Sequence, residues 1–128
     1  TTAISPRLAL LINNPQFAAF SDNTRFMGLQ SGKQFVVYDA ELTRVYRYQS
    51  TLTIAATQQA KWMDGHRFSV VADGKNSVFD FDGTNLQTLV NSRQEFPVYF
   101  DRDYQYVYSL VPQADGRTGL QNGQIILP

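Results

Sequence analysis

The sequence predicts an all-β fold, and three observations support this prediction. Short runs of residues rich in Val, Phe and Tyr alternate with turn-forming Asp, Asn, Gly and Ser residues along the chain. No window of a dozen residues keeps the i, i+3, i+4 apolar spacing of an amphipathic helix. The pattern of strands and turns also repeats at about 40 residues, which is typical of folds that stack one supersecondary unit.

The repeat is clearest between residues 19–42 and residues 61–86. Six residue pairs in these two copies share an offset of 42: Phe20 with Trp62, Asp22 with Asp64, Arg25 with Arg67, Phe26 with Phe68, Gly32 with Gly74, and Lys33 with Lys75. Each copy contains four runs of strand-forming residues that are separated by short turns. We therefore expect a four-stranded antiparallel sheet in each copy.

A third copy begins at residue 96. In this copy Phe100 aligns with Trp62, and Tyr106 aligns with Phe68, both at an offset of 38. Large aromatic residues thus recur at equivalent strand positions in successive copies. A repeated large residue is best explained by packing between neighbouring sheets, so we assign most of the aromatic residues to the core.

A strand precedes the first copy, because residues 8–14 (LALLINN) resemble residues 86–92 (LQTLVNS) at the end of the second copy. This likeness predicts that the chain starts inside a repeat. The expected boundaries are a leading strand over residues 7–14 and three blade-like units over residues 15–50, 53–92 and 95–128.

Sheets of four strands that repeat at about 40 residues are the blades of a β-propeller. The middle strands fit this assignment, because residues 35–38 (FVVY) and 68–71 (FSVV) are almost continuously apolar, as expected for strands covered on both faces. Three blades do not close a ring, for which four is the usual minimum. We expect the chain to be part of a larger propeller; the alternative is that another copy of the chain covers the open blades.

The composition excludes several classes of protein. Eleven Lys and Arg balance eleven Asp and Glu, so the strong positive charge of a nucleic-acid binder is absent. The chain has no Cys and a single His, which removes most of the ligands of a zinc site. The longest aliphatic run, residues 8–12, is far shorter than the roughly 20 residues that span a bilayer. We therefore expect no nucleic-acid partner, no membrane insertion, no metal and no cofactor.

The first two copies resemble the WD-like propeller repeats of the TolB C-terminal domain. The matching residues are Phe20, Ser21, Asp22, Tyr38 and Asp39 in the first copy, and Trp62, Asp64, Gly65, Phe81, Asp82 and Gly83 in the second. The resemblance implies a propeller that acts as a bacterial protein-interaction platform or as the non-catalytic half of a hydrolase. It also implies an extracytoplasmic location, in the periplasm or at the cell surface, which nothing else in the sequence indicates.

The sequence offers no convincing catalytic or metal-binding group. His66 with Asp64 could act as a general base, but the other copies place Thr24 and Tyr104 at the same position, which favours a solvent-facing residue. The GLQSGK segment (28–33) lacks the spacing of a phosphate-binding loop and is interpreted as a hairpin turn. The paired carboxylates of DFDG (80–83) and DRD (101–103) lack the remaining ligands of a calcium loop.

Two features remain as candidate binding residues. Lys33, Lys75 and Arg117 each follow a glycine in the turn between the second and third strands of a copy, so we expect them on one rim, facing an anionic partner. Tyr104 lies in a segment with five aromatic residues and is expected to be exposed.

The sequence thus predicts a non-catalytic module that mediates protein–protein interaction through its rim. The first alternative is an accessory propeller of a hydrolase or other enzyme whose catalytic domain lies outside the chain. The second alternative is lectin-like binding of a small ligand beside Tyr104. Self-association to complete the propeller is a further expectation.

Overall fold

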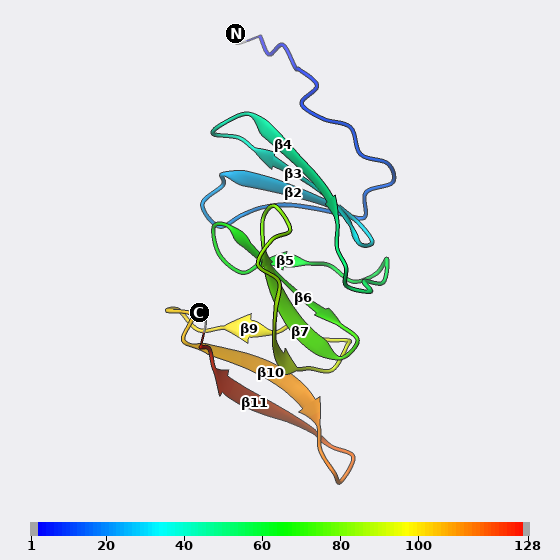
Figure 1. Cartoon of the computed structure of the whole chain (residues 1–128), viewed down its shortest axis with the longest axis vertical. Helices are drawn as coiled ribbons and strands as arrows, with labels where there is room; N and C mark the ends of the chain where they lie inside the picture. The colour runs from blue at the N-terminus through cyan, green and yellow to red at the C-terminus, as the bar shows by residue number, and fades with distance from the viewer. Residues whose placement is uncertain (1–2, 127–128) are drawn as a thin grey trace.

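The computed structural model describes residues 3–126, and this part of the chain forms eleven β-strands and no helix (Figure 1). The strands are β1 (Phe17–Phe20), β2 (Phe26–Ser31), β3 (Gln34–Asp39), β4 (Arg44–Gln49), β5 (Lys61–Trp62), β6 (Arg67–Ala72), β7 (Lys75–Asp80), β8 (Gln87–Asn91), β9 (Tyr99–Phe100), β10 (Tyr106–Pro112) and β11 (Thr118–Gln124). The predicted all-β class is confirmed.

The strands form three antiparallel sheets, each made from consecutive strands. Sheet 1 has the order β1-β2-β3-β4, sheet 2 has the order β5-β6-β7-β8, and sheet 3 has the order β11-β10-β9. The sheets stack along the long axis of the molecule, in an arrangement compatible with propeller blades, and they do not close a ring (Figure 1). In each sheet the first strand of the copy forms one edge, so β1, β5 and β9 are equivalent.

Two-residue turns fix the register of the central hairpins. Gly32 takes a positive φ of 58° between β2 and β3, and Asp73 and Gly74 take positive φ values of 54° and 72° between β6 and β7. Positive φ at these positions gives the turn a twist that matches the flanking strands, and glycine adopts it without steric cost. The phosphate-loop pattern at residues 28–33 is therefore a strand followed by a hairpin turn.

The main core fills the space between sheets 1 and 2. It is built mainly from aromatic and β-branched side chains, together with two alanines, and all of them are almost completely buried. Its buried members are Phe26, Phe35, Val37, Ile54, Ala60, Phe68, Val70, Ala72 and Phe79. The rings pack in several geometries, with Phe35 and Phe79 edge to face at 5.5 Å between centroids and Phe26 stacked on Phe81 at 4.2 Å.

Sheets 2 and 3 share a smaller core. Val71, Val98 and Val107 are buried there, and Val90 and Phe100 pack against them. This core contains fewer large side chains than the first, so less apolar area holds sheet 3 in place.

The structure corrects the alignment of the second strands by one residue. Phe26 and Gly28 point from sheet 1 toward sheet 2, because a Cβ on Gly28 would lie 2.8 Å from Cζ of Phe68. Phe68 points from sheet 2 back toward sheet 1, so these two phenylalanines lie on opposite faces of their sheets. A shift of one residue along a strand reverses the face of every side chain. Counted back from the two-residue turns, Met27 and Phe68 are each the fifth residue from the end of the second strand, so Met27 is the counterpart of Phe68.

The structure also corrects two expectations about strands. Residues 7–14 form no strand, and most of their side chains are exposed. Residues 95–126 contain three strands where four were expected, and residues 127–128 of the predicted third unit lie outside the described residues. A strand needs a hydrogen-bonding partner. Residues 7–14 do not reach the edge of any sheet in the described part of the chain, and no segment of that part pairs with the outer edge of β11. The three sheets themselves span residues 17–49, 61–91 and 99–124.

Candidate functional site

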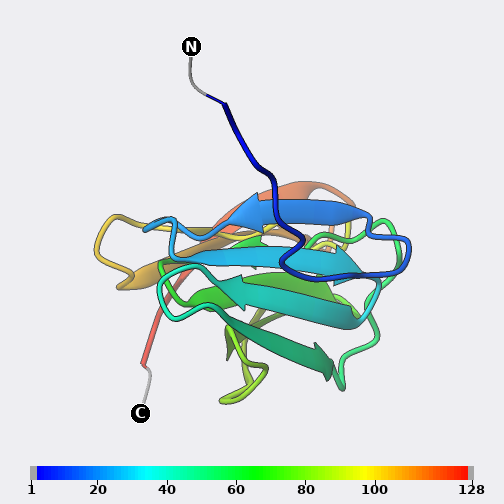
Figure 2. The same ribbon diagram turned by 90° about the horizontal axis from the view of Figure 1, so that it is seen from above.

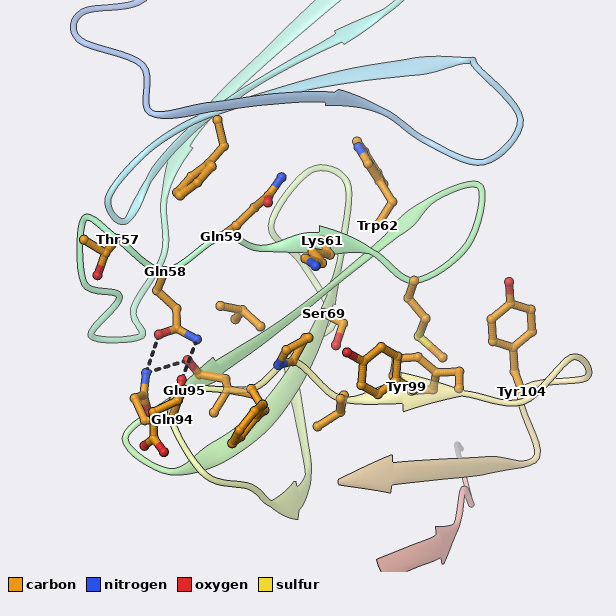
Figure 3. A pocket seen from close by; sticks show the side chains of 18 residues that line it. Thr57, Gln58, Gln59, Lys61, Trp62, Ser69, Gln94, Glu95, Tyr99 and Tyr104 are labelled. Carbon is orange, nitrogen blue, oxygen red and sulfur yellow. Dashed lines mark hydrogen bonds between the residues drawn. The ribbon is translucent and has the colours of Figure 1, made fainter. Parts of the chain in front are cut away.

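A cleft of about 740 Å³ runs along the edge strands β1, β5 and β9 (Figure 3). It collects side chains from all three sheets and from the two segments that connect them. The lining residues are Phe17, Thr57, Gln58, Gln59, Lys61, Trp62, Met63, Ser69, Val70, Val71, Gln94, Glu95, Phe96, Pro97, Val98, Tyr99, Phe100 and Tyr104. The wall is therefore a mixture of aromatic rings, aliphatic side chains and amide groups.

Amide side chains gather at one end of the cleft (Figure 3). Gln94 donates from Nε2 to Oε1 of Gln58 at 2.7 Å and to the carbonyl of Val71 at 2.9 Å, and its Oε1 accepts from the backbone amide of Gly74 at 2.9 Å. These bonds join the connection before sheet 2 to the connection before sheet 3. Because Gln58 and Gln94 are half-buried and mutually bonded, this end of the wall is held in place rather than free to rearrange.

The middle of the cleft is formed by strand β5. The indole of Trp62 donates from Nε1 to the carbonyl of Ala19 at 2.8 Å and stacks on Phe68 with 3.9 Å between ring centroids. Trp62 therefore ties the edge of sheet 2 to the edge of sheet 1. The preceding residue, Lys61, is exposed.

Tyr104 lies at the other end of the cleft, in the turn between β9 and β10. Its backbone has a positive φ of 56°, and its ring lies 6.3 Å from that of Phe100. Partial burial raises the pKa of the Tyr104 hydroxyl, and the carboxylates of Asp22 and Asp64 raise it further. The side chain is half-buried, which is less exposure than the sequence predicted. Tyr104 therefore reaches across to the turns of sheets 1 and 2.

The aspartates that the sequence placed at turns do serve the turns. Oδ1 of Asp64 accepts from the backbone amides of His66 at 2.9 Å and Arg67 at 2.8 Å, and the Arg67 guanidinium binds its Oδ2. Burial alone would raise the pKa of Asp64, but these hydrogen bonds bring the pKa below its ordinary value. The ring of His66 is exposed, with Nδ1 at 3.4 Å from the same carboxylate. Asp64 is thus engaged in local structure, which is the role that the sequence favoured.

The paired carboxylates also hold turns. Asp82 accepts from the amide and hydroxyl of Thr84 at 3.2 and 2.6 Å, and Asp101 accepts from the amide of Gln105 at 2.8 Å. Residues 3–126 contain no group of three or more His, Asp and Glu side chains arranged to hold a metal ion. The same residues contain no helix long and apolar enough to cross a membrane.

Of the three rim cations, Lys33 and Arg117 lie in turns, whereas Lys75 is the first residue of β7, directly after the turn formed by Asp73 and Gly74. Lys33, Lys75 and Arg117 are all exposed, and the turns between the second and third strands lie along the same side of the stack (Figure 1). Their surroundings are not uniformly basic. Arg117 pairs with Asp115 at 2.7 Å, and Asp73 is exposed beside Lys75. An anionic partner would therefore meet a surface of mixed sign.

Local sequence patterns do not reveal the cleft. Its amide residues lie in irregular connections, and its aromatic residues lie partly in strands and partly in connections and turns, so the stacking of the sheets is what brings them together. The repeat gave one partial signal, because it placed Trp62 and Phe100 at equivalent positions on edge strands. Tyr104 is the one predicted binding residue that lines the cleft.

No family model matches the sequence, and the searches of curated proteins and of solved structures also found no match. The assignment of a function therefore depends on the geometry of the molecule.

Proposed function

We propose that the chain is a non-catalytic binding module that holds a segment of a protein partner in the cleft along β1, β5 and β9. One observation carries this proposal: the cleft combines exposed apolar rings with a fixed row of amide groups. Phe96 is exposed at the amide end, and Gln58 and Gln94 are bonded to each other beside it. Rings supply buried apolar area to a bound segment. Both N–H groups of the Gln94 amide are already engaged, but the amide oxygens of Gln58 and Gln94 each accept a single hydrogen bond here, so each can accept a second one from a peptide N–H of the segment.

The charge of the cleft also favours a peptide over a nucleic acid. Lys61 and Glu95 are exposed in the same wall, so the surface carries both signs. A nucleic-acid site would gather cations along the path of the phosphates. The resemblance to TolB-like propeller repeats supports the same class of function, because those propellers are mainly interaction platforms. An accessory role beside a catalytic domain is compatible with the same cleft.

The working surface in this function is the cleft, and not the rim that the sequence favoured. The rim cations stand apart on separate hairpins, and Arg117 is paired with Asp115. The cleft brings together side chains from three sheets in a concave surface, where a partner can bury more of its own surface. Concave sites on rigid scaffolds are the usual location of ligand binding.

The experiment that tests the proposal uses a library of random dodecapeptides displayed on phage and selected on the immobilised chain. Selected peptides are then synthesised, and their affinities are measured for two variants. The cleft variant carries Lys61→Ser, Phe96→Ala and Tyr104→Ala. The rim variant carries Lys33→Ser, Lys75→Ser and Arg117→Ser. All six residues are exposed or half-buried, so both variants should fold.

We expect the cleft variant to lose at least about tenfold in affinity, which corresponds to about 1.4 kcal/mol, while the rim variant binds normally. The opposite result would assign binding to the rim. Failure to select any peptide would overturn the proposal. A glycan panel tests the lectin-like alternative, for which the half-buried Tyr104 in the same cleft is the supporting observation. Glycan binding that is lost in the cleft variant would favour that alternative.

A further inference from the structure

The third sheet has an open edge. Sheets 1 and 2 each have four strands, but sheet 3 ends at β11, and no strand of residues 3–126 pairs with the outer side of β11. Its outward-facing Leu120 is 68% exposed. An unpaired strand of seven residues presents a row of free N–H and C=O groups, which is a template for another strand.

Sheet 1 has an open face, the one that points away from sheet 2. Strand pairing shows that this face carries an aromatic residue at the position that is covered by a neighbouring sheet in sheets 2 and 3. Phe20 pairs with Met27 on the next strand, Trp62 pairs with Phe68, and Phe100 pairs with Val107, so the first residues of these pairs occupy one equivalent position. Trp62 packs against sheet 1, and Phe100 packs against sheet 2.

In each of these two cases the aromatic residue contacts the preceding sheet. Phe20 has no preceding sheet in the described chain, and it is 49% exposed. Other apolar side chains share its face of sheet 1, including Val45, which is also exposed. The outer face of sheet 1 is therefore equipped to receive a sheet.

Residues 7–14 supply the sequence of the missing strand. The segment LALLINN (8–14) aligns with β8 and its neighbours in LQTLVNS (86–92), so Ile12 corresponds to Val90. Val90 is on the fourth strand of sheet 2 and packs toward sheet 3. Ile12 already lies in a groove with Val36 and Arg47 on sheet 1. The segment crosses the open face of sheet 1, where the fourth strand of a preceding sheet would lie (Figure 2).

We propose that two copies of the chain form a closed dimer in which residues 7–14 of each copy become the fourth strand of sheet 3 in the other. The outer face of sheet 3 then packs on the outer face of sheet 1 of the partner. The contact joins two different surfaces of the chain, so repeating it gives either a closed ring of chains or an open fibre. Two copies supply six sheets, which is within the usual range of four to eight for a closed propeller. This inference does not depend on the proposed cleft function.

The faces that meet have matching chemistry. The outer face of sheet 3 carries Tyr99, which is 58% exposed, and Tyr108 directly opposite it on β10. Leu120 pairs with Leu110 on the same sheet. These rings and aliphatic side chains would cover Phe20 on the partner. The interface would thus remove from water the open edge of β11 and the apolar outer faces of sheets 1 and 3.

Strand pairing also gives the register. Thr88 of β8 lies opposite Ser77 of β7, and the alignment places Leu10 at the position of Thr88. Val70 and Ser109 are equivalent, because each lies two residues after the strand partner of the edge aromatic residue. Ser77 pairs with Val70 and Gln121 pairs with Ser109, so Gln121 on β11 is the counterpart of Ser77. Leu10 of one copy should therefore lie opposite Gln121 of the other. Residues directly opposite in an antiparallel pair have Cα atoms about 4.5–5.5 Å apart, which a disulfide can bridge.

The first test uses engineered disulfides, because the natural chain has no cysteine. The single variants Leu10→Cys and Gln121→Cys are mixed, oxidised mildly and run on a non-reducing gel. We expect a covalent dimer of one chain of each type from the mixture. Each variant alone should give much less dimer. Ala9→Cys mixed with Gln121→Cys is the matched control, since its side chain lies one residue out of register.

Absence of a cross-linked dimer in the mixture, or equal yields from the matched and shifted pairs, would overturn the proposed pairing. The doubly substituted chain adds a second criterion. If it forms an internal disulfide within a monomer, the segment pairs with its own sheet and the second copy is not required, which would also overturn the proposal.

The second test measures mass in solution by light scattering over a dilution series. We expect twice the 14.5 kDa mass of one chain for the natural sequence. Phe20→Lys and Leu120→Lys change exposed residues of the two faces, and each should give a folded monomer with half that mass. Lys75→Ser, on the rim, should leave the dimer intact. A natural chain that is monomeric throughout, or that forms larger open assemblies, would contradict the closed dimer.

Discussion

At the scale of single residues, the aspartates show how local chemistry fixes the turns. Asp39 is 1% exposed, accepts from the backbone amides of Glu41 and Leu42 at 3.0 Å, and pairs with Arg25 at 3.0 Å. The hydrogen bond from the Arg25 guanidinium holds the pKa of the Asp39 carboxyl below its ordinary value, against the opposing effect of burial. The sequence predicted a turn-starting aspartate here, and the structure adds the arginine that keeps it charged.

The lowered pKa of Asp39 predicts a dependence of stability on pH. A carboxyl group whose pKa falls on folding stabilises the fold above its unfolded pKa of about 3.9, and this contribution is lost as the pH falls through the folded value. Asp39→Asn should therefore lower the thermal midpoint at pH 7, and the difference from the natural chain should shrink toward pH 2. Thermal unfolding followed by circular dichroism across this range measures it.

Asp115→Asn provides the control for this prediction. Asp115 also pairs with an arginine, but the pair is exposed, and exposed pairs contribute little to stability. An equal loss of stability in both variants, or a loss in Asp39→Asn that persists at low pH, would show that the charge of Asp39 is not the cause.

At the scale of elements, the close approach of sheets 1 and 2 depends on a residue without a side chain. A Cβ on Gly28 would lie 2.8 Å from Cζ of Phe68 and 3.0 Å from Cζ2 of Trp62, and the φ of Gly28 is not positive. The requirement is therefore one of space and not of backbone conformation. The sequence repeat could not show this, because it aligned Phe26 with Phe68 and so placed both on the same face.

Gly28→Ala should destabilise the chain by about 1–3 kcal/mol, the usual cost of overpacking a tight core. Chemical denaturation measures this change in the free energy of unfolding. Phe68→Leu removes part of the ring that the new methyl would meet. The double variant should therefore be more stable than the sum of the two single effects predicts. Strict additivity would show that the two residues do not compete for the same space.

At the scale of the whole molecule, the three sheets are held unequally. The core between sheets 1 and 2 contains several large aromatic rings, whereas the core between sheets 2 and 3 rests on Val71, Val98 and Val107. Sheet 3 also has no fourth strand within residues 3–126. Free energies of local opening follow buried apolar contact and hydrogen bonding, so sheet 3 should open first.

Native-state hydrogen exchange tests this order. Amides of β10 should exchange faster than those of β6 in the natural chain diluted to the monomer or in Phe20→Lys. In the proposed dimer, β11 gains a neighbour, and the protection of β10 and β11 should rise with concentration. Uniform protection of the amides in all three sheets of the monomer would contradict the expectation that sheet 3 opens first.

The sequence determined the local structure of this protein. Residue type and period set the strands, the positive-φ turns at Gly32 and Gly74, and the all-β class, because these depend on neighbours in the chain. Repetition also identified Phe20, Trp62 and Phe100 as equivalent, and their strand partners bear this out.

The tertiary structure decided which strands and side chains contact one another across different sheets. The face of Phe26, the fate of residues 7–14 and the cleft at Gln58 and Gln94 depend on contacts between sheets, which a period of about 40 residues does not encode. A strand-like sequence becomes a strand only where an edge is available to pair with it. For residues 7–14 no such edge is within reach in the described chain, and for β11 no strand arrives.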